Sequence, residues 1–444
     1  MTIGDKNKKL TTKVTATLAL GALAATSLCA VAGSTASASS APITLSILTH
    51  INPPTQQALA TLDAAFEAKY PNIKVQVTAA ATGELPTVRD TRMAAKEVDI
   101  TEVSPFMGAT NPSYVVGQPP NIWGELVEAH KFVNLSGQPF LKDFIPSAVQ
   151  SVGGVGSGEY AIPSGTDIFT GVYYNKAIFA KYGLSVPTTW DALMNVCKVL
   201  QAHGVPPFIT GQKDGWPAGL VMYAVQQGLW PTMTSAWGLE KAIWTTKNAF
   251  EAPLAVQALK ETQAIFSYTI KGFGGIPYAD APGEFAAGKA AMTIDGTWSE
   301  PTIAQANPQL QFGYFPLPAT NNPTVNARWG GKYDIAWSIV SSSQHQAAAL
   351  DWMAFYSDPA NYAKFIDTSG FVPAEPNIQS TAFNNSLHIT PTNFSTNFSI
   401  IEVSKINAPQ QAGFDYLDIA PLGKAYTNMT QLAAVEQNAW NNAG

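Results

Sequence analysis

Short apolar runs and longer helical patterns alternate through residues 43–103, and this alternation constrains the fold more than any other feature of the chain. The predicted elements are a strand at 43–48, a helix at 55–70, a strand at 73–78, a helix at 89–96 and a strand at 98–103. The first helix is the clearest, because Leu59, Leu62 and Phe66 fall on one face at helical spacing. Strands separated by helices pair in parallel beneath those helices. The sequence therefore predicts an α/β fold with a parallel sheet.

A glycine-rich stretch at 153–167 interrupts the pattern, and the alternation restarts beyond it. Strands are predicted at 171–175, 207–210, 290–294, 312–318 and 335–340, and helices from 176, from 190, at 344–357 and from 359. Asp358 is predicted to cap the last helix, with Pro359 in its first turn. A chain of 444 residues suggests two or three domains. We interpret the glycine-rich stretch as a crossing between domains, although a surface loop would have the same composition.

The stretch GEFAAGKA at 283–290 nearly spells a phosphate-binding P-loop. A working P-loop follows a strand, precedes a helix and ends in a hydroxyl side chain that binds magnesium. Here Ala290 replaces the hydroxyl, and the predicted helix precedes the glycine while the strand follows it. Gly288 is therefore predicted to end a helix in the left-handed conformation, and nucleotide binding is not expected.

Residues 1–38 have the features of a secretory signal peptide. Four lysines precede an uncharged run at 14–32, and an A-S-A sequence at 36–38 offers a cleavage site. A short membrane anchor is the alternative, because the uncharged run could just span a bilayer. Cys29 would allow lipidation, but Leu28 stands where lipoprotein processing usually requires a small residue. We expect an exported protein, periplasmic or associated with the cell surface, and do not favour a lipid anchor.

Charge and residue types exclude several classes of function. The formal net charge is −6, and loss of the N-terminal lysines makes the remainder more acidic. An acidic exported protein is a poor partner for nucleic acid or an anionic membrane surface. The histidines show no metal-binding spacing, so no metal and no cofactor are expected. After cleavage only Cys197 remains; it shares a helical face with Leu193 and Leu200, which predicts a buried thiol and excludes an intrachain disulfide.

A carboxylate and a large ring follow the predicted strand at 290–294, as Asp295 and Trp298. In open α/β sheets, ligands bind at the carboxyl ends of strands. A carboxylate and an indole at that edge offer a hydrogen-bond acceptor and a flat stacking surface. The alternative for Trp298 is a place over the hydrophobic core.

Five segments of the chain resemble the extracellular solute-binding proteins of ABC importers, of the carbohydrate-binding kind. In family order they are FEAKYPNIKVQV (66–77), GEYAIPSGTDIFTGVYYNKAIFAKYGLSVPTTWDAL (158–193), FAAGKAAMTIDGTW (285–298), RWGGKYDIAWSI (328–339) and AAALDWMAFYSDPANYAKFIDTSGFVPA (347–374). Each segment is weak by itself, whereas five in the family order are specific.

The resemblance implies the type II periplasmic-binding-protein fold, in which two α/β lobes joined by a hinge close over a ligand in the cleft between them. Lobe one would comprise 41–158 and 319–368, and lobe two 165–312 and 372–444. Hinge crossings would lie near 159–165, 313–318 and 368–373. The family's function implies a monomer without catalytic residues that captures a mono- or oligosaccharide and delivers it to the membrane subunits of an ABC permease.

The resemblance and the strand-edge argument together give candidate ligand-binding residues. Sugars present apolar faces and a rim of hydroxyls, which suit ring side chains and fixed polar groups. The candidates are the rings of Trp216, Trp298, Trp329 and Tyr333 and the polar groups of His50, Asn52, Glu102, Asp167 and Asp295. Core, helix-capping or solvated roles remain open for each. The segment after the strand at 98–103 departs from the family pattern. The ligand contacts of lobe one are therefore less well defined than those of lobe two, and this includes Glu102 as a hydroxyl acceptor.

Two alternatives remain open. The cargo could be a polyol, a glycerol-phosphate-like compound or a peptide; a phosphate would need converging cations, for which only Arg328 and Lys332 are obvious, so a neutral ligand is favoured. A secreted glycan-acting hydrolase would need a paired acid and base or a nucleophile. The chain has no G-x-S-x-G motif, and no enzymatic activity is expected.

Overall fold

The computed structural model of the protein describes residues 42–103, 111–118, 122–390, 393–395, 405, 408, 413–423 and 426–443. The predicted signal peptide, with Cys29, lies outside these ranges. Within them, no helix combines the length and the apolar character needed to cross a membrane.

The first sheet has five strands in the order β2-β1-β3-β13-β6. They are β1 (Ile43–His50), β2 (Ile73–Ala80), β3 (Ile100–Val103), β13 (Ala336–Ile339) and β6 (Ile162–Pro163). β1 pairs in parallel with β2 and β3, which confirms the arrangement predicted from the alternation. β13 runs antiparallel to both β3 and β6. The parallel part is therefore completed by strands from much later in the chain.

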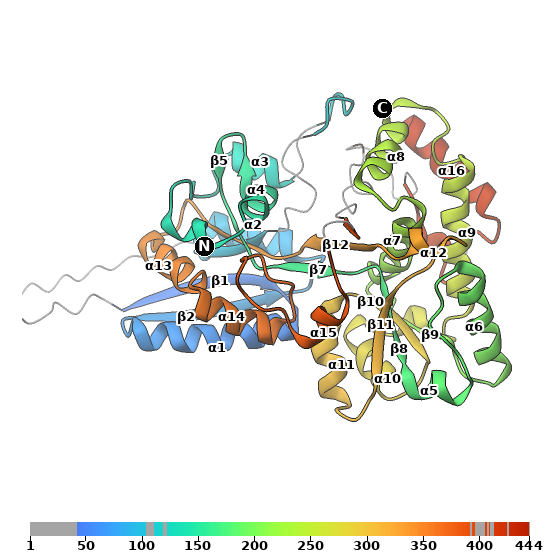
Figure 1. Cartoon of the computed structure of the whole chain (residues 1–444). Helices are drawn as coiled ribbons and strands as arrows, with labels where there is room; N and C mark the ends of the chain where they lie inside the picture. Colours follow the sequence, from blue (N-terminus) through green and yellow to red (C-terminus); the bar gives the residue numbers. More distant parts are fainter. Residues whose placement is uncertain are drawn as a thin grey trace, which may run out of the picture. The chain divides into compact units, whose positions relative to one another are not determined.

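Helices pack against both the strands and one another around this sheet (Figure 1). They are α1 (Pro53–Lys69), α2 (Leu85–Ala95), α3 (Ile122–Glu128), α4 (Pro146–Gly153), α13 (Gln346–Tyr356) and α14 (Pro359–Ser369), with a 3-10 turn η2 (Pro139–Asp143) and the hairpin β4 (Gly154–Val155) and β5 (Gly158–Glu159). The α1, α13 and α14 helices contact one another and bury Phe66 and Trp352. Asp358 accepts hydrogen bonds from the backbone N–H groups of Ala360 and Asn361, which confirms the predicted N-cap of α14.

The second sheet has four strands in the order β11-β8-β10-β9. They are β8 (Gly171–Asn175), β9 (Phe208–Ile209), β10 (Met292–Asp295) and β11 (Phe312–Pro316). β8 runs antiparallel to β10 and β11, whereas β9 and β10 are parallel. The carboxyl ends of β9 and β10 therefore lie at the same edge of the sheet.

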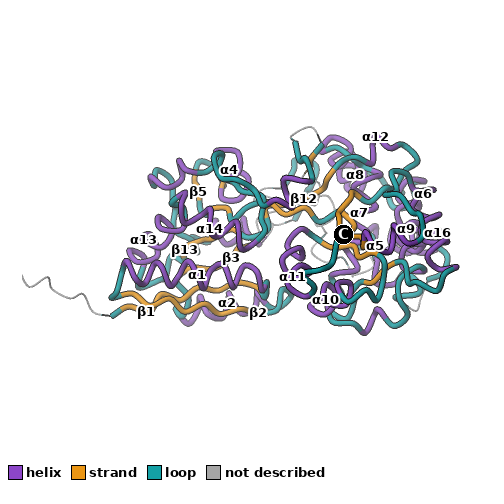
Figure 2. Tube along the Cα trace, turned by 60° about the horizontal axis from the view of Figure 1, so that its bottom comes forward, coloured by secondary structure: helices purple, strands orange, loops and turns teal. Residues whose placement is uncertain are grey.

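A second group of helices surrounds this sheet (Figure 2). They are α5 (Lys176–Lys181), α6 (Trp190–Ala202), α7 (Pro217–Leu229), α8 (Met233–Thr245), α9 (Pro253–Ser267), α10 (Ala281–Ala286), α11 (Glu300–Ala306) and α16 (Met429–Asn442). Except for α10 and α11, these helices contribute apolar side chains, with β8 and β10, to a core cluster that includes Cys197. The α10 and α11 helices bury Phe285 and Ile303 in a second, smaller cluster. Cys197 is buried, which confirms the predicted buried thiol, and burial raises the pKa of the thiol to about 12. Gly288 follows α10 with φ +78°, which confirms its predicted left-handed conformation.

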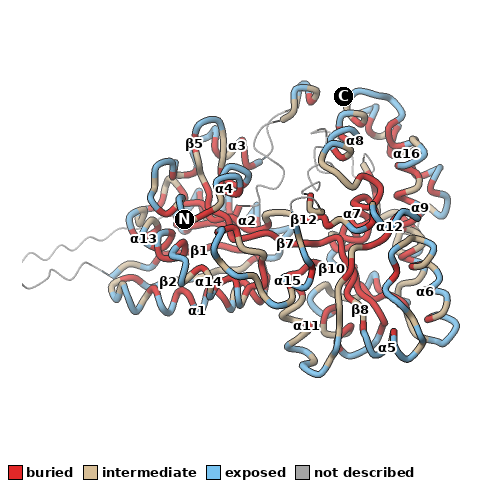
Figure 3. The backbone as a smooth tube through the Cα atoms, viewed as in Figure 1, coloured by how far each residue is buried: buried red, intermediate tan, exposed pale blue. Residues whose placement is uncertain are grey.

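A third, three-stranded sheet has the order β14-β12-β7. It consists of β7 (Thr166–Ile168), β12 (Trp329–Tyr333) and β14 (Phe394–Ser395). Thr166 exchanges backbone hydrogen bonds of 2.8 and 2.9 Å with Val372, so two of the predicted crossings lie side by side. Gly165 precedes this bridge, and a Cβ there would lie 2.7 Å from the Val372 carbonyl oxygen, which only glycine avoids. Figure 3 shows that β1, β8 and β10 are largely buried, whereas most residues of β2 are only partly buried or exposed.

The remaining short elements connect these parts. They are α12 (Pro323–Asn326), α15 (Ala382–Ser386) and the 3-10 turns η3 (Phe273–Gly275), η4 (Tyr278–Asp280), η5 (Thr297–Ser299) and η7 (Tyr416–Asp418). The α12 helix is tied to the start of α6, because Asn326 donates a 2.9 Å hydrogen bond to the Thr188 carbonyl and Trp190 N–H donates to Thr320.

Candidate ligand-binding site

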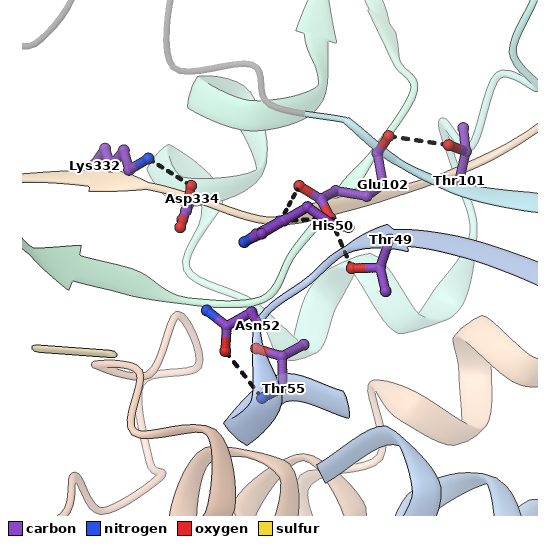
Figure 4. Close-up of polar contacts among 8 residues, drawn as sticks. All are labelled: Thr49, His50, Asn52, Thr55, Thr101, Glu102, Lys332 and Asp334. Atoms are coloured by element: carbon purple, nitrogen blue, oxygen red, sulfur yellow. Dashed lines mark hydrogen bonds and ion pairs between the residues drawn. The ribbon is translucent and has the colours of Figure 1, made fainter. Parts of the chain in front are cut away.

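His50 and Glu102 lie together where β1 and β3 end (Figure 4). The Nδ1 atom of His50 is 2.8 Å from Oε1 of Glu102, and Oε2 of Glu102 accepts hydrogen bonds from the Thr49 hydroxyl at 2.7 Å and the His50 N–H at 2.8 Å. Burial by itself lowers the pKa of His50, but the carboxylates of Glu102 and Asp334 outweigh it and raise the pKa above 6.5. The imidazole therefore holds its proton on Nδ1, and its second nitrogen points away from Glu102.

A second ion pair lies beside this one. Lys332, on β12, is 2.7 Å from Asp334. Burial by itself raises the pKa of Asp334, but Lys332 and His50 outweigh it and hold the pKa below 3.8. His50, Lys332 and Asp334 therefore lie within electrostatic range of one another, and each cation has a carboxylate partner.

Asp167 is fully buried on β7, directly opposite Lys332 in the antiparallel register. Its Oδ1 accepts a 3.2 Å hydrogen bond from the Thr297 hydroxyl, while Oδ2 has no hydrogen-bond partner within the part of the chain that the structure describes. Burial and the neighbouring charge of Asp334 raise the pKa of Asp167 well above 3.8. Asp167 thus presents a buried oxygen that a ligand hydroxyl could satisfy.

Trp298 and Asp295 are joined through Tyr278 of η4. The indole Nε1 of Trp298 donates to the Tyr278 hydroxyl, which in turn donates a 3.0 Å hydrogen bond to Oδ1 of Asp295. The other Asp295 oxygen accepts a 2.8 Å hydrogen bond from Ser299. Burial raises the pKa of Asp295 to about 6. These contacts fix the plane of the Trp298 ring at the carboxyl end of β10.

Trp216 and Lys332 flank this network from two sides. The Trp216 ring, at the start of α7, lies 4.5 Å from the Tyr278 ring. The Nζ atom of Lys332 lies 5.6 Å from the Trp298 ring centroid, within the range of a cation–π interaction. Trp216 and Trp298 therefore belong to one cluster, which Lys332 joins to the ion pairs.

The other three predicted residues have clear structural partners. The Asn52 side chain accepts a 3.2 Å hydrogen bond from the Thr55 N–H and caps α1. Trp329 is buried and stacks on Tyr314, with ring centroids 5.4 Å apart and an interplanar angle of 6°. Tyr333, partly exposed at the end of β12, pairs with Thr166 of β7. Ligand roles for these residues remain predictions.

Sequence reasoning missed several members of the cluster. Tyr278 sits in an isolated 3-10 turn without periodicity, and only its contacts with Trp298 and Asp295 identify it. Outside this cluster, Tyr114 donates a 2.7 Å hydrogen bond to Glu240 of α8, a contact between residues far apart in sequence. The pairing of Lys332 with Asp334 has a weak local signal, since residues two apart on an extended strand share a face.

In the part of the chain that the structure describes, neither a further cavity nor a metal site coincides with the predicted residues. A cavity of about 290 Å³ is lined by Pro53, Pro54, Gln57, Pro301, Thr302, Gln305 and Thr368, none of which is a predicted site residue. Among the described residues, no group of three or more histidine, cysteine, aspartate or glutamate side chains could hold a metal ion.

Comparisons with known proteins identify relatives of the chain. A multiple sugar-binding protein of Streptococcus mutans is 27% identical over 69% of this chain and 69% of its own length. An uncharacterized ABC transporter extracellular-binding protein of Pyrococcus horikoshii is 25% identical over 72% of this chain and 68% of its own.

Two solved structures show the same fold. The solute-binding protein RafE in complex with raffinose has a TM-score of 0.72 at 21% identity, covering 90% of this chain and 99% of that one. Maltose-bound MalE3 of T. maritima has a TM-score of 0.67 at 18% identity, covering 90% and 99%. The two-lobe α/β fold expected from the sequence is thereby confirmed.

The sequence also matches a protein family over residues 52–363, which is most of the chain. The family's description is that of binding proteins, which decides against a hydrolase. The chain belongs to the bacterial extracellular solute-binding protein family.

Proposed function

We propose that this protein is the sugar-binding component of an ABC importer. The observation that carries the proposal is the position of Trp298, whose ring is fixed by Tyr278 and lies beside Lys332. The preceding residue, Thr297, donates a hydrogen bond to Asp167, whose other oxygen is buried without a described partner. A fixed indole covers the apolar face of a sugar ring, and buried carboxylates accept its hydroxyl protons. The similarity to a multiple sugar-binding protein supports the same cargo class.

The charges around the site favour a neutral ligand. Lys332 is paired with Asp334 and His50 with Glu102, so neither cation requires an anionic ligand to balance it. A phosphate-binding site would instead present cations that converge without carboxylates. The charges therefore disfavour a glycerol-phosphate-like cargo. The similarity to a multiple sugar-binding protein favours a mono- or oligosaccharide over a polyol or a peptide.

The ligand residues divide by role in this proposal. Trp298 and Trp216 provide stacking surfaces, while His50, Glu102, Asp167 and Asp295 provide hydrogen bonds. Asn52, Trp329 and Tyr333 complete the predicted set, although the helix cap at Asn52 and the stacked position of Trp329 favour supporting roles for those two.

The proposed lobes follow the sheets. Lobe one contains the five-stranded sheet, lobe two the four-stranded sheet, and the segments near 159–165 and 368–373 cross between them. Residues 319–326 are better placed in lobe two than in lobe one, because Asn326 and Thr320 are bonded to the start of α6. Ligand that prefers the closed arrangement would shift the population towards it.

The proposed cellular role extends the family assignment. Residues 1–38 would direct export and be removed, without lipidation of Cys29. The mature protein would act as a monomer that delivers its ligand to the permease subunits at the membrane.

A thermal-shift screen of the purified mature protein tests the proposal. Because a ligand at 100 times its dissociation constant adds about 2.7 kcal/mol to stability, a bound sugar should raise the melting temperature by several degrees. Trp298→Ala and Tyr278→Phe should each lose most of this shift. Trp190→Phe is the matched control, since Trp190 packs beside the same core from α6 and should leave the shift intact. A folded protein that no sugar stabilises, but that a polyol, phosphate compound or peptide does, would contradict the carbohydrate assignment.

A further inference from the structure

One hydroxyl group ties two distant segments of the chain to lobe one. Tyr362, on α14, is fully buried, and its hydroxyl donates a 2.9 Å hydrogen bond to the Ser164 carbonyl and accepts one of 2.9 Å from the Ala374 N–H. The ring packs edge-on against Phe144, with ring centroids 5.5 Å apart, in the core of the first sheet. Because α14 also packs on α1, the hydroxyl keeps a fixed position in lobe one.

Lobe one also holds the start of β7. Thr166 and Val372 are joined by two backbone hydrogen bonds, and Val372 lies two residues before Ala374, which the Tyr362 hydroxyl holds. The end of the crossing near 368–373 therefore stays with lobe one and carries Thr166 with it.

The end of β12 is held in the same way. The Ser164 N–H donates a 2.9 Å hydrogen bond to the Ile335 carbonyl, and Thr166 pairs with Tyr333 across β7 and β12. The Tyr333 side chain packs against two apolar clusters of the first sheet. From Tyr333 onwards, β12 therefore belongs with lobe one.

Lobe two holds both strands only two residues away. The Ile168 N–H donates a 3.1 Å hydrogen bond to the hydroxyl of Thr297, which follows β10 of the second sheet. Ile168 is also buried in a small cluster with Trp329, against which Tyr314 of β11 packs. Gly331 pairs with Ile168 across the two strands. Ile168 and Gly331 therefore move with lobe two.

One residue of each strand lies between these two holds, and the two face each other, because Asp167 pairs with Lys332 in the antiparallel register. We propose that the lobes pivot at Asp167 and Lys332, and that Tyr362 is the positioning residue that clamps the lobe-one side of this pivot. The inference rests on the proposed division into lobes and on the proposed sugar ligand.

The two pivot residues also belong to the candidate site. Asp167 has a buried oxygen without a hydrogen-bond partner among the described residues, and Lys332 lies over the Trp298 ring. A ligand that contacts them senses the angle between the lobes directly, so it can prefer the closed arrangement.

Hydrogen exchange of the ligand-free mature protein, followed by mass spectrometry with fragmentation that resolves single amides, tests the clamp. Tyr362→Phe removes the hydroxyl and leaves its two buried backbone partners unsatisfied. Exchange should become about tenfold faster within 164–166 and 372–374 and keep its wild-type rate within 168–175. Acceleration that spreads through β8, or no acceleration in the folded variant, would overturn the clamp.

Ser343→Ala is the matched control in the same lobe. The Ser343 hydroxyl also donates one hydrogen bond and accepts one, at 2.6 Å to Asp99 and at 2.9 Å from the His345 N–H, near the start of β3. This variant should leave exchange within 164–166 and 372–374 at the wild-type rate. Equal acceleration in both variants would show a general loss of stability and would overturn the specific role of Tyr362.

Crystal structures of the wild type without sugar and with raffinose or maltose, whichever raises the melting temperature more, locate the pivot. After superposition on lobe one, Thr166 and Tyr333 should coincide, while Ile168 and Gly331 should have moved with lobe two. A change of angle whose boundary lies elsewhere, or two structures with the same angle, would overturn the pivot. Failure of every sugar in the thermal screen to raise the melting temperature would contradict the proposed function instead, and the exchange experiment would still decide the clamp.

Discussion

The Nδ1 atom of His50 lies 2.8 Å from Oε1 of Glu102, and the two residues end neighbouring parallel strands. Glu102 is almost fully enclosed, and both of its oxygens accept hydrogen bonds from the β1 side. The pair therefore holds the edge of the first sheet in one geometry and leaves the second imidazole nitrogen for a ligand. The contribution of this pair to the stability of the protein depends on the protonation of His50, and this dependence on pH can be measured.

Replacement of His50 by glutamine should destabilise the ligand-free protein in a pH-dependent manner. The folded-state pKa of His50 is raised above 6.5, so its contribution to folding is fully present below that pH and is lost as the pH rises through the folded value. The wild type should exceed His50→Gln in melting temperature at about pH 5.5, and the gap should close towards about pH 9. Thermal unfolding across this range measures it; a gap that widens with pH would show that Glu102 and Asp334 do not hold the proton.

Asp63 offers a stability prediction away from the site. It is buried in α1, accepts a 2.8 Å hydrogen bond from the Trp352 indole, and burial raises its pKa to about 7. The native state therefore binds more protons than the unfolded chain between the unfolded and folded pKa values, and stability falls as the pH rises through this window.

Asp63→Asn should remove that loss, because the amide oxygen still accepts from Trp352 and carries no charge. The variant should be more stable than the wild type by about 2 kcal/mol at about pH 8, and nearly equal to it at about pH 4.5. Urea unfolding at the two pH values provides the comparison. A variant that is less stable at the higher pH would mean that the charged carboxylate is well accommodated beside Trp352.

Ligand should also close the two lobes. If the sugar contacts Trp298 from one lobe and Glu102 from the other, it binds the closed arrangement more tightly and shifts the population towards it. Small-angle X-ray scattering should show a smaller radius of gyration with saturating sugar. An unchanged radius in a sample whose binding is confirmed by calorimetry would exclude closure as the response.

Much of the fold is predictable from local pattern. The alternation that ends at Val103 gives the parallel strands β1, β2 and β3, and the Asp358-Pro359 pair gives the start of α14. The place of β13 between β3 and β6 is not encoded locally, because its pairing depends on residues far apart in sequence. The same applies to the three-stranded sheet, whose short strands carry little periodicity.

The candidate site divides in the same way. Asp295 and Trp298 follow from the rule that ligands bind at the carboxyl ends of strands, whereas His50 and Glu102 are expected from the family resemblance. Tyr278 depends on its tertiary contact with Trp216 at the start of α7, which no local pattern predicts. Trp329 shows where local sequence misleads. Its glycine-rich surroundings suggest an exposed loop, but its ring is stacked on Tyr314.

The central claim is that a fixed indole and buried hydrogen-bonding groups hold a neutral sugar without altering it. Calorimetric titration of the best sugar from the thermal screen into wild type and Trp298→Ala is its most direct test. We expect saturable binding to one site in the wild type and a loss of at least about tenfold in the variant, with Trp190→Phe unchanged. Equal affinity in wild type and a folded Trp298→Ala variant would contradict the account.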